Sequence, residues 1–320
     1  MRSVRSLAPV LVLLLVSTAG CPLASMDMEL KTLNINGQIR TYWVYAPASC
    51  DGSAPVPLVL ALHPFATTGL YMARTTNFNA VADEEGFIVA YPNGCTRLWN
   101  GDPTDDQQGR DQCRDDVQFV DALLDELPSS YRIDPARIYV CGASNGGLMT
   151  QRLACELAER FAAAASVMTT LPVGWGEVCE PTAPISVLLM QGVDDPFFPW
   201  EGGTVQQGPF MQSDYGSAAD MVTFWVSSNS SVSPPTTEDM PDTVPEDGTT
   251  VFRETYTAGP AGAEVVFYGI VGGGHTWPGS TPRLSPLVGT TSQDIDATRT
   301  IWEFFARHAG PSRQASGEDR

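Results

Sequence analysis

The sequence predicts an α/β fold in which a mostly parallel sheet carries helices on both faces. Apolar runs alternate along the chain with segments of helical periodicity, which is typical of repeated strand–helix–strand units. The later runs lack polar alternation, as expected of strands buried on both faces. The expected strands lie at 41–47, 57–63, 87–93, 137–142, 184–192 and 263–271.

Three segments have the spacing of helices. VQFVDALLDEL at 117–127 follows two acidic residues, which favour a helix N-terminus. A second helix is expected to begin just after Ser144 and to include LMTQRLACELAERF. The last, DIDATRTIWEFFARH at 294–308, carries one apolar stripe that consists of Ile295, Thr298, Trp302 and Phe305.

The N-terminus predicts export. Arg2 and Arg5 precede the short apolar run LAPVLVLLLV, too short for a membrane span, so residues 1–20 are expected to be a signal peptide. STAGC resembles a lipobox ending at Cys21, although Thr18 stands where leucine is preferred. Ordinary cleavage after Ala19 or Gly20 also fits, so both a lipid-anchored and a freely secreted or periplasmic protein stay open.

The remaining length suits one domain. We expect a linker at 21–28, a catalytic domain at 29–310 and a disordered tail at 311–320. The Ser-, Pro- and acid-rich segment 227–250 is expected to be a surface excursion within that domain, because too few residues follow it for an ordinary second domain.

The net charge and the cysteine pattern argue against several classes of partner and of metal site. The net charge is −19, and removal of the two signal arginines gives −19 − 2 = −21, which argues against nucleic acid and anionic membranes as partners. An even set of six cysteines after Cys21 fits an oxidising compartment, and no CxxC or Cys/His cluster indicates a metal. Plausible pairs are Cys95 with Cys113 and Cys155 with Cys179, while Cys50 and Cys141 leave the connectivity open.

The most informative segment is RIYVCGASNGG. A strand enters the G-x-S-x-G of residues 142–146 and a helix pattern starts at once, the context of a nucleophile elbow in an α/β-hydrolase fold. The turn presents Ser144 at a helix N-terminus, which favours developing negative charge. The sequence therefore predicts Ser144 as a catalytic nucleophile.

The nucleophile requires a base and an acid. His275 follows an expected strand near the C-terminus, which is the position of the base in the chain order Ser…Asp/Glu…His. His63 is expected to be structural, beside the oxyanion loop, and His308 a helix C-terminal cation. Asp194 and Asp195 follow the strand at 184–192, and one of them should accept the His275 Nδ1–H.

Three motifs then carry a resemblance over roughly residues 35–305. GASNGG, GVDDPFFPW and GGGHTWPG resemble those of secreted polyhydroxybutyrate depolymerases and feruloyl esterases, the LpqC-like esterases of the α/β-hydrolase superfamily. The resemblance implies Asp195, directly before a proline, as the acid. Further matching segments are LWNG (98–101), RDDVQFVDALLDEL (114–127), IDPARIYVCGASNGGLMTQRLAC (133–155) and MPDTVPEDGTTVFRETY (240–256).

The resemblance also implies an oxyanion loop, here LHPFATTG. Pro64 replaces a glycine of the family pattern and has no N–H, so the expected donors are the backbone N–H groups of Phe65 and Asn145. Gln191 is a second departure, because relatives commonly have histidine there. A third is SSNSSVS, which lacks a cysteine often found there.

These residues predict a secreted serine esterase without metal or organic cofactor. The expected substrates are feruloyl or acetyl esters of polysaccharides, or short 3-hydroxyalkanoate esters, with polyhydroxybutyrate oligomers as the alternative. Trp277 and Trp99 are the expected substrate-binding residues, with Phe65 and Phe197 or Phe198 as further apolar wall. A non-catalytic envelope lipoprotein and a serine peptidase of the prolyl-oligopeptidase kind stay as other hypotheses.

Overall fold

The computed structural model describes residues 27–104, 115–207, 211–260, 262–281 and 287–310. The expected signal peptide, Cys21, most of the expected linker and the expected tail lie outside these residues. Cys113 is outside them as well.

A ten-stranded sheet forms the centre of the described chain. Its order is β1-β2-β4-β3-β5-β6-β7-β12-β11-β10, and the six strands from β4 to β12 are parallel to one another. The outer strands pair antiparallel, and β8 (Gly203–Gln207) and β9 (Met211–Tyr215) form a separate hairpin. The sheet strands are β1 (Glu29–Ile35), β2 (Gln38–Tyr45), β3 (Val56–Leu62), β4 (Ile88–Pro92), β5 (Ile133–Ala143), β6 (Ala163–Val167), β7 (Ser186–Gly192), β10 (Thr236–Asp239), β11 (Thr250–Tyr256) and β12 (Val265–Val271).

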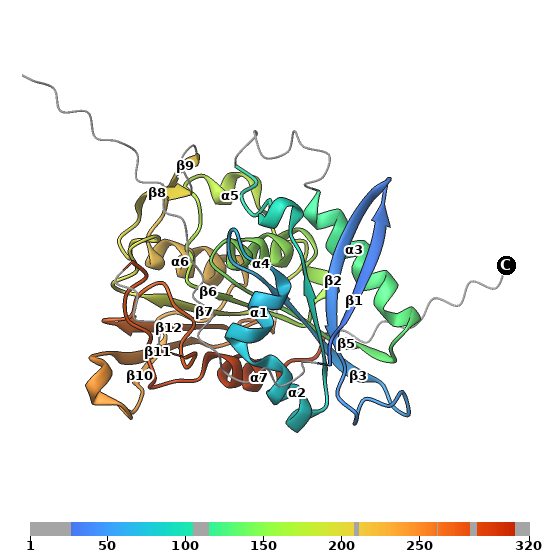
Figure 1. Cartoon of the computed structure of the whole chain (residues 1–320). Helices are drawn as coiled ribbons and strands as arrows, with labels where there is room; N and C mark the ends of the chain where they lie inside the picture. The colour runs from blue at the N-terminus through green and yellow to red at the C-terminus, as the bar shows by residue number, and fades with distance from the viewer. Residues whose placement is uncertain (1–26, 105–114, 208–210, 261, 282–286, 311–320) are drawn as a thin grey trace, which may run out of the picture.

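Helices cover both faces of this sheet (Figure 1). One face carries α3 (Asp116–Glu126), α4 (Asn145–Glu156), α5 (Trp175–Val178) and α6 (Ala218–Ser228). The other carries α1 (Gly69–Thr76), α2 (Phe78–Glu85) and α7 (Ala297–Ala306). Strand β3 shows the division, because Leu58, Leu60 and Leu62 pack in one core and Val59 and Ala61 in the other. The predicted α/β-hydrolase architecture, with a mostly parallel sheet in a single domain, is confirmed.

The segment 227–250 is less irregular than its composition suggests. It contains the exposed strand β10, which pairs antiparallel with β11 at the edge of the sheet. A short 3-10 turn at Pro245–Asp247 then leads into β11. The segment thus extends the sheet of the same domain.

The cysteines divide into bonded and free groups. Cys155 and Cys179 form a disulfide with Cα atoms 6.0 Å apart, as the sequence suggested, and this bond ties the end of α4 to the end of α5. Cys95 is also disulfide-bonded. Cys50 and Cys141 are free, and burial raises the pKa of the Cys141 thiol, which keeps it protonated and unreactive.

Candidate active site

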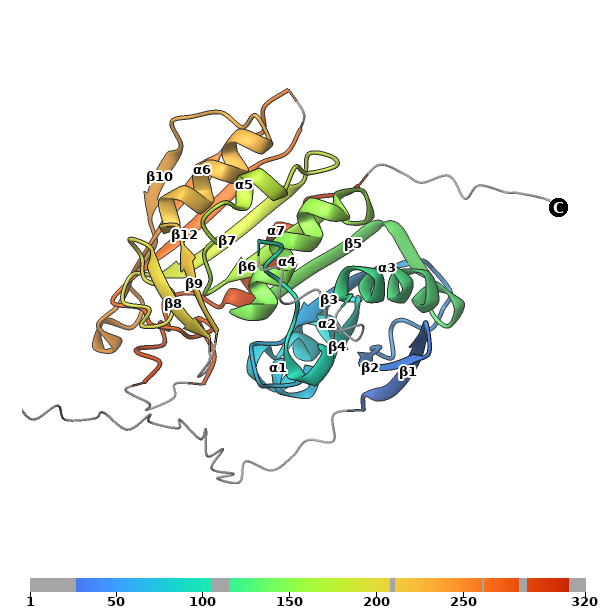
Figure 2. The same cartoon turned by 90° about the horizontal axis from the view of Figure 1, so that it is seen from above.

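The three predicted catalytic residues follow three strands of the parallel part of the sheet. Ser144 follows β5, Asp195 follows β7 and His275 follows β12. Figure 2 shows β5, β6, β7 and β12 next to one another, in agreement with the strand order. Because parallel strands end at the same edge, all three loops lie at the carboxyl edge of the sheet, where ligands bind in open α/β folds.

Ser144 occupies a strained backbone conformation between β5 and α4. Its φ is 56° and its ψ is −122°, which is uncommon for a residue with a Cβ atom. Its N–H donates to the carbonyl of Val167 at 2.9 Å, and the Ser144 carbonyl accepts from Leu148 N–H at the start of α4. The residue is 7% exposed. The neighbouring strand and the helix therefore hold the turn that presents the hydroxyl.

Gly146 allows this turn to pack against β3. A Cβ atom at this position would lie 2.4 Å from the carbonyl oxygen of Leu62 and 2.6 Å from that of His63. Both contacts are far inside van der Waals distance and involve backbone that cannot move freely. The second glycine of the motif is therefore required by the close approach of α4 to the end of β3.

Asp195 and His275 are in direct contact. His275 Nδ1 donates to Asp195 Oδ2 at 2.8 Å, and the Asp195 side chain is fully buried. Asp194 is exposed, and among the described residues no hydrogen bond or ion pair joins its carboxylate to the ring. The geometry thus distinguishes between the two acids that the chain order alone left open.

The Asp195 carboxylate is fixed by three further donors. Oδ1 accepts the backbone N–H groups of Phe197 and Phe198 at 2.8 and 2.9 Å. Oδ2 accepts the Gln191 side-chain amide at 3.2 Å in addition to His275, and the same amide donates to the Phe198 carbonyl at 2.9 Å. Gln191, known from the sequence only as a departure from the family pattern, therefore orients the acid.

The His275 ring is positioned by its backbone and by two aromatic neighbours. Its backbone N–H donates to the Val288 carbonyl at 2.6 Å. Phe197 contacts the ring edge to face at a centroid distance of 5.0 Å, and Phe198 is stacked at 5.8 Å. Within the described residues no hydrogen bond joins Ser144 to this ring, and such catalytic contacts often form only when substrate binds.

The glycines before His275 are explained by a second loop that passes close to them. Gly274 N–H donates to the Thr290 carbonyl at 2.9 Å, and a Cβ at Gly274 would lie 2.2 Å from the Val288 carbonyl oxygen. A side chain there would push the loop of residues 288–290 away. Because the same loop accepts the His275 N–H, the imidazole would move with it.

Two backbone donors remain available where the sequence predicted an oxyanion hole. The N–H groups of Phe65 and Asn145 donate to no acceptor within the described residues, and Asn145 is the first residue of α4. The loop around Phe65 is closed by other bonds, since Ala66 N–H donates to the Arg97 carbonyl and Thr67 N–H to the Pro64 carbonyl. Pro64, which has no N–H to donate, thus contributes to the loop through its carbonyl, which accepts the Thr67 N–H.

The residue after the nucleophile is also held by its side chain. Asn145 Oδ1 accepts the Trp99 N–H at 2.8 Å, and Nδ2 donates to the Trp99 carbonyl at 3.1 Å. Asn100, which follows Trp99, donates its backbone N–H to the Asp116 carboxylate. This buried carboxylate also accepts a hydrogen bond from Arg40 Nη2, at 2.5 Å from Oδ1. Burial raises the pKa of Asp116, and the arginine and backbone N–H offset part of this shift. Sequence reasoning did not identify this support.

His63 supports the loop before Phe65. Its Nδ1 donates to the Pro64 carbonyl at 2.8 Å, and its Nε2 accepts the Gly94 N–H at 2.9 Å. Both ring nitrogens are therefore used, and the ring is fully buried. Burial lowers the pKa of His63 to about 4, so the ring is neutral and fixed in one tautomer at neutral pH.

Comparison with known proteins identifies the family of this chain. The chain is 34% identical over 297 residues to the putative esterase NocK of Nocardia uniformis subsp. tsuyamanensis, covering 89% of this chain and 84% of that protein. The chain belongs to the NocK esterase family. It is therefore a carboxylic ester hydrolase on the α/β-hydrolase fold.

More distant relatives are similar over smaller parts or in fold alone. Feruloyl esterase B of Piromyces equi is 31% identical over 175 residues, 52% of this chain and 31% of that protein. An acetyl xylan esterase from Aspergillus awamori shares the fold with a TM-score of 0.59 and 18% identity, over 87% of this chain and 99% of that one. A model of the prolyl oligopeptidase family matches residues 73–172, less than half of the chain.

The esterase places the two predicted substrate-binding tryptophans in its core, so that prediction is wrong. Trp277 is 2% exposed, packs edge to face on Phe78 and donates its indole N–H to Thr298. Trp99 is fully buried, and its indole N–H donates to the His63 carbonyl. Both rings are buried against loops of the site and expose almost no surface to a ligand.

Other aromatic residues of the esterase are exposed at the site. Phe65, in the predicted oxyanion loop, and Phe197, against the His275 ring, are each 41% exposed. Among the described residues there is no group of His, Cys, Asp and Glu side chains arranged to hold a metal ion. Nor does any described helix have the length and apolar character needed to cross a membrane.

Proposed function

We propose that Ser144, His275 and Asp195 act as a catalytic triad for ester hydrolysis, with Ser144 as the nucleophile. The observation that carries the proposal is the 2.8 Å contact between His275 Nδ1 and Asp195 Oδ2 at the same sheet edge as the strained Ser144 turn. A buried carboxylate bound to Nδ1 keeps the ring in the tautomer whose Nε2 can accept a proton. Membership of an esterase family supports the same assignment.

Acylation begins when Ser144 Oγ attacks the ester carbonyl carbon. His275 Nε2 takes the hydroxyl proton, and Asp195 stabilises the imidazolium that forms. The backbone N–H groups of Phe65 and Asn145 donate to the oxyanion of the tetrahedral intermediate. Each such donor typically contributes on the order of a hundredfold in rate. His275 then gives its proton to the departing alkoxide, which leaves as an alcohol.

Deacylation reverses these steps with water as the nucleophile. His275 takes a proton from water, the hydroxide oxygen attacks the acyl carbon, and the same two N–H groups hold the second oxyanion. Collapse of this intermediate returns the proton to Ser144 Oγ and releases the carboxylic acid.

We propose feruloyl or acetyl esters of polysaccharides, or short 3-hydroxyalkanoate esters, as substrates. The exposed rings of Phe65 and Phe197 flank the proposed site and suit an aromatic acyl group. The names feruloyl esterase and acetyl xylan esterase among the similar proteins favour the polysaccharide esters. Oligomers of 3-hydroxybutyrate are the alternative.

A panel of purified-enzyme assays tests this choice. Methyl ferulate, acetylated xylan, p-nitrophenyl acetate and 3-hydroxybutyrate oligomers would be compared, with Ser144→Ala as the inactive control. We expect hydrolysis of at least one of these esters by the wild type and a loss of about 10⁴-fold or more in the variant. Full activity of Ser144→Ala would contradict the triad and would leave a binding protein with a contaminating esterase as the explanation.

A serine peptidase activity is a second candidate, because the prolyl oligopeptidase model matches residues 73–172, which include the Ser144 turn. This part of the fold is common to many α/β-hydrolases, so the match does not select peptide bonds. Dipeptidyl anilides with proline before the scissile bond provide the test. Rapid cleavage of these anilides without hydrolysis of p-nitrophenyl acetate would favour the peptidase.

We also propose that the enzyme is exported through the signal at 1–20. The Cys155–Cys179 disulfide supports an oxidising compartment. The proposed mature protein has its catalytic domain at 29–310, and Cys21 is the proposed site of a lipid anchor. Intact-mass measurement of the protein exported by its native host tests both points. A diacylglyceryl mass increment on Cys21 is expected, and an unmodified N-terminus would leave a freely secreted enzyme.

A further inference from the structure

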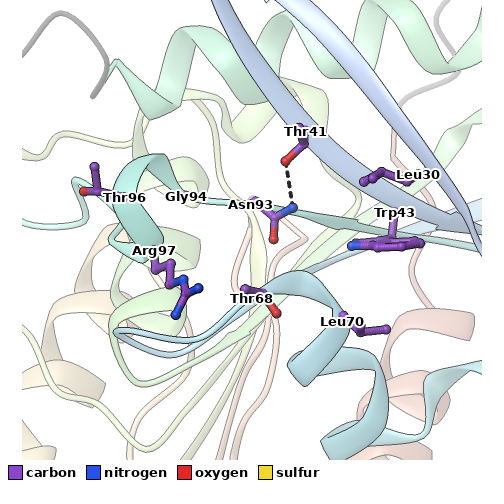
Figure 3. Close-up of a pocket in the computed structure, with 9 residues that line it drawn as sticks. All are labelled: Leu30, Thr41, Trp43, Thr68, Leu70, Asn93, Gly94, Thr96 and Arg97. Atoms are coloured by element: carbon purple, nitrogen blue, oxygen red, sulfur yellow. Dashed lines mark hydrogen bonds between the residues drawn. The ribbon is translucent and has the colours of Figure 1, made fainter.

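A hollow lies beside the predicted oxyanion loop (Figure 3). In the sheet, β2 and β4 lie on the opposite side of β5 from β7 and β12, the strands that precede Asp195 and His275. It has a volume of about 410 Å³, and Asn93 and Gly94, which follow the carboxyl end of β4, are part of its lining. Trp43 and Leu30 line one side and Arg97 the other, with Thr68 and Asn93 between them. The triad mechanism does not use any of these side chains.

Two hydrogen bonds connect the loop that lines the hollow to the loop of the proposed oxyanion hole. The Arg97 carbonyl accepts the Ala66 N–H at 2.8 Å, and the Gly94 N–H donates to His63. Strands β4 and β2 lie two and three positions from β5 in the sheet. At about 4.8 Å per strand, the hollow lies about 10–14 Å to the side of Ser144. This separation suits a part of the substrate remote from the ester that is cleaved.

The polar side chains of the hollow that keep a free hydrogen-bonding group offer mainly donors. Thr41 Oγ1 accepts from Asn93 Nδ2, and Thr68 Oγ1 accepts from Tyr71 N–H, so each hydroxyl keeps its own hydrogen to donate. Asn93 Oδ1 accepts from Gly69 N–H, which leaves one side-chain N–H free. The hollow therefore favours a ligand rich in acceptors.

Arg97 adds a positive charge to these donors. Its exposed guanidinium forms no ion pair or hydrogen bond with any described residue, although the chain has 37 acidic residues against 18 basic ones. In contrast, Arg40, Arg152 and Arg253 each pair with a carboxylate. An arginine without a protein carboxylate beside it can bind an anionic ligand through two parallel hydrogen bonds.

The backbone that carries Arg97 is held in an unusual conformation. Thr96 and Arg97 are consecutive residues with φ angles of 53° and 65°, although neither is glycine. Cys95, directly before them, is fixed by its disulfide. Such strain persists only where the surrounding structure enforces it, and it is concentrated at functional sites. Here it projects the guanidinium over the hollow.

We propose that this hollow is a second subsite, which binds a carboxylate on the substrate remote from the cleaved ester, through Arg97. This inference rests on the proposed ester hydrolysis. Two substrates would present the required carboxylate, namely the free end of a 3-hydroxyalkanoate oligomer and an acidic sugar of an esterified polysaccharide. The Trp43 ring would pack against the apolar part of either ligand.

The test compares matched charged and neutral substrates. One arm uses a 3-hydroxybutyrate trimer as the free acid and as its methyl ester. The other uses acetylated xylo-oligosaccharides with and without a glucuronic acid side group. We expect KM for the charged member to be about fivefold to tenfold lower than for its neutral partner in at least one arm. This preference should shrink as salt is raised, because a partly exposed ion pair is screened.

Variants then assign the preference to Arg97. Arg97→Gln is expected to abolish the charged-over-neutral preference, and Arg97→Lys to keep part of it, because lysine retains the charge without the planar fork. Arg74→Gln is the matched control, because it removes the same charge from the exposed surface of α1 outside the hollow. It should leave the ratio of the two KM values as in the wild type.

The arm that shows an Arg97-dependent preference identifies the source of the carboxylate. Equal KM values for charged and neutral members in both arms, with normal turnover, would overturn the subsite and leave the esterase proposal intact. An equal loss of preference in Arg97→Gln and Arg74→Gln would also overturn it, because general electrostatic attraction would then be the cause. Absence of hydrolysis of every ester would instead contradict the proposed function.

Discussion

Replacement of Asp195 by asparagine is expected to disable the enzyme while changing one atom. In the native site, Oδ1 accepts two backbone N–H groups from Phe197 and Phe198. The asparagine oxygen must therefore occupy the Oδ1 position, since an NH₂ group there would face two donors. The amide NH₂ is forced into the Oδ2 position, 2.8 Å from His275 Nδ1.

This orientation selects the wrong histidine tautomer. The NH₂ donates to Nδ1, so the ring proton moves to Nε2, which can then no longer accept the Ser144 proton. The same NH₂ would also face the Gln191 amide, which donates to Oδ2 in the native site. By analogy with other triads the expected loss in kcat is about 10⁴-fold, equivalent to about 5.5 kcal/mol of transition-state stabilisation.

The assay is steady-state hydrolysis of p-nitrophenyl acetate at pH 7–8, with thermal unfolding to confirm that the variant is folded. Asp194→Asn is the matched control, because it makes the same chemical change at the adjacent exposed carboxylate. Its kcat should stay within about twofold of the wild type. A folded Asp195→Asn variant that keeps more than a tenth of the activity would refute the tautomer argument, as would equal losses in both variants.

Three further predictions concern the supports of the site. Gly146→Ala should abolish activity or folding, because its Cβ would lie 2.4 Å from the Leu62 carbonyl oxygen; normal kcat in a folded variant would contradict this. Trp277→Phe should lower the free energy of unfolding by about 1–2 kcal/mol and leave KM unchanged, because the ring packs in the core. Denaturant unfolding and steady-state kinetics measure these two quantities. A raised KM with unchanged stability would show instead that Trp277 is a substrate-binding residue. The His63 pKa is lowered from 6.5 to about 4, so its contribution to stability is complete above pH 6.5 and is lost as pH falls towards 4. That loss is about 3 kcal/mol (1.36 × 2.5), and a His63→Gln variant with the same acid sensitivity as the wild type would argue against it.

The parts of the fold that the sequence predicts well are those whose own residues determine the structure. The apolar runs that became β3, β5 and β7 are buried on both faces, so their composition alone indicates central strands. Strand β6 consists of Ala-Ala-Ala-Ser-Val, in which only the last residue favours a strand. Strand β10 is exposed at all four residues, and only its pairing with β11 makes it a strand.

The same distinction applies to the site. Ser144 and His275 could be found from motifs, because close backbone approach requires glycines on both sides of Ser144 and directly before His275. The direction of a side chain next to a catalytic residue could not be found in this way. Trp277 is two residues from His275, yet the turn between them directs its ring onto Phe78, about 200 residues earlier.

Residues that act through others were the hardest to predict. Gln191 carries no catalytic signature, and only the folded chain brings its amide onto the Asp195 carboxylate. The hollow with Arg97 requires β2, β4 and the loop after β3 to come together, and these are separate in sequence. Such arrangements follow from tertiary packing, which local patterns do not specify.

Trapping of the acyl-enzyme tests directly whether Ser144 is the nucleophile. The purified enzyme would be mixed with p-nitrophenyl acetate, quenched with acid within milliseconds to seconds, digested and analysed by mass spectrometry. We expect a burst of p-nitrophenol and an acetyl group on the peptide that contains Ser144, with neither in His275→Ala. An acetyl group on another residue, or a full burst in the Ser144→Ala variant, would contradict it.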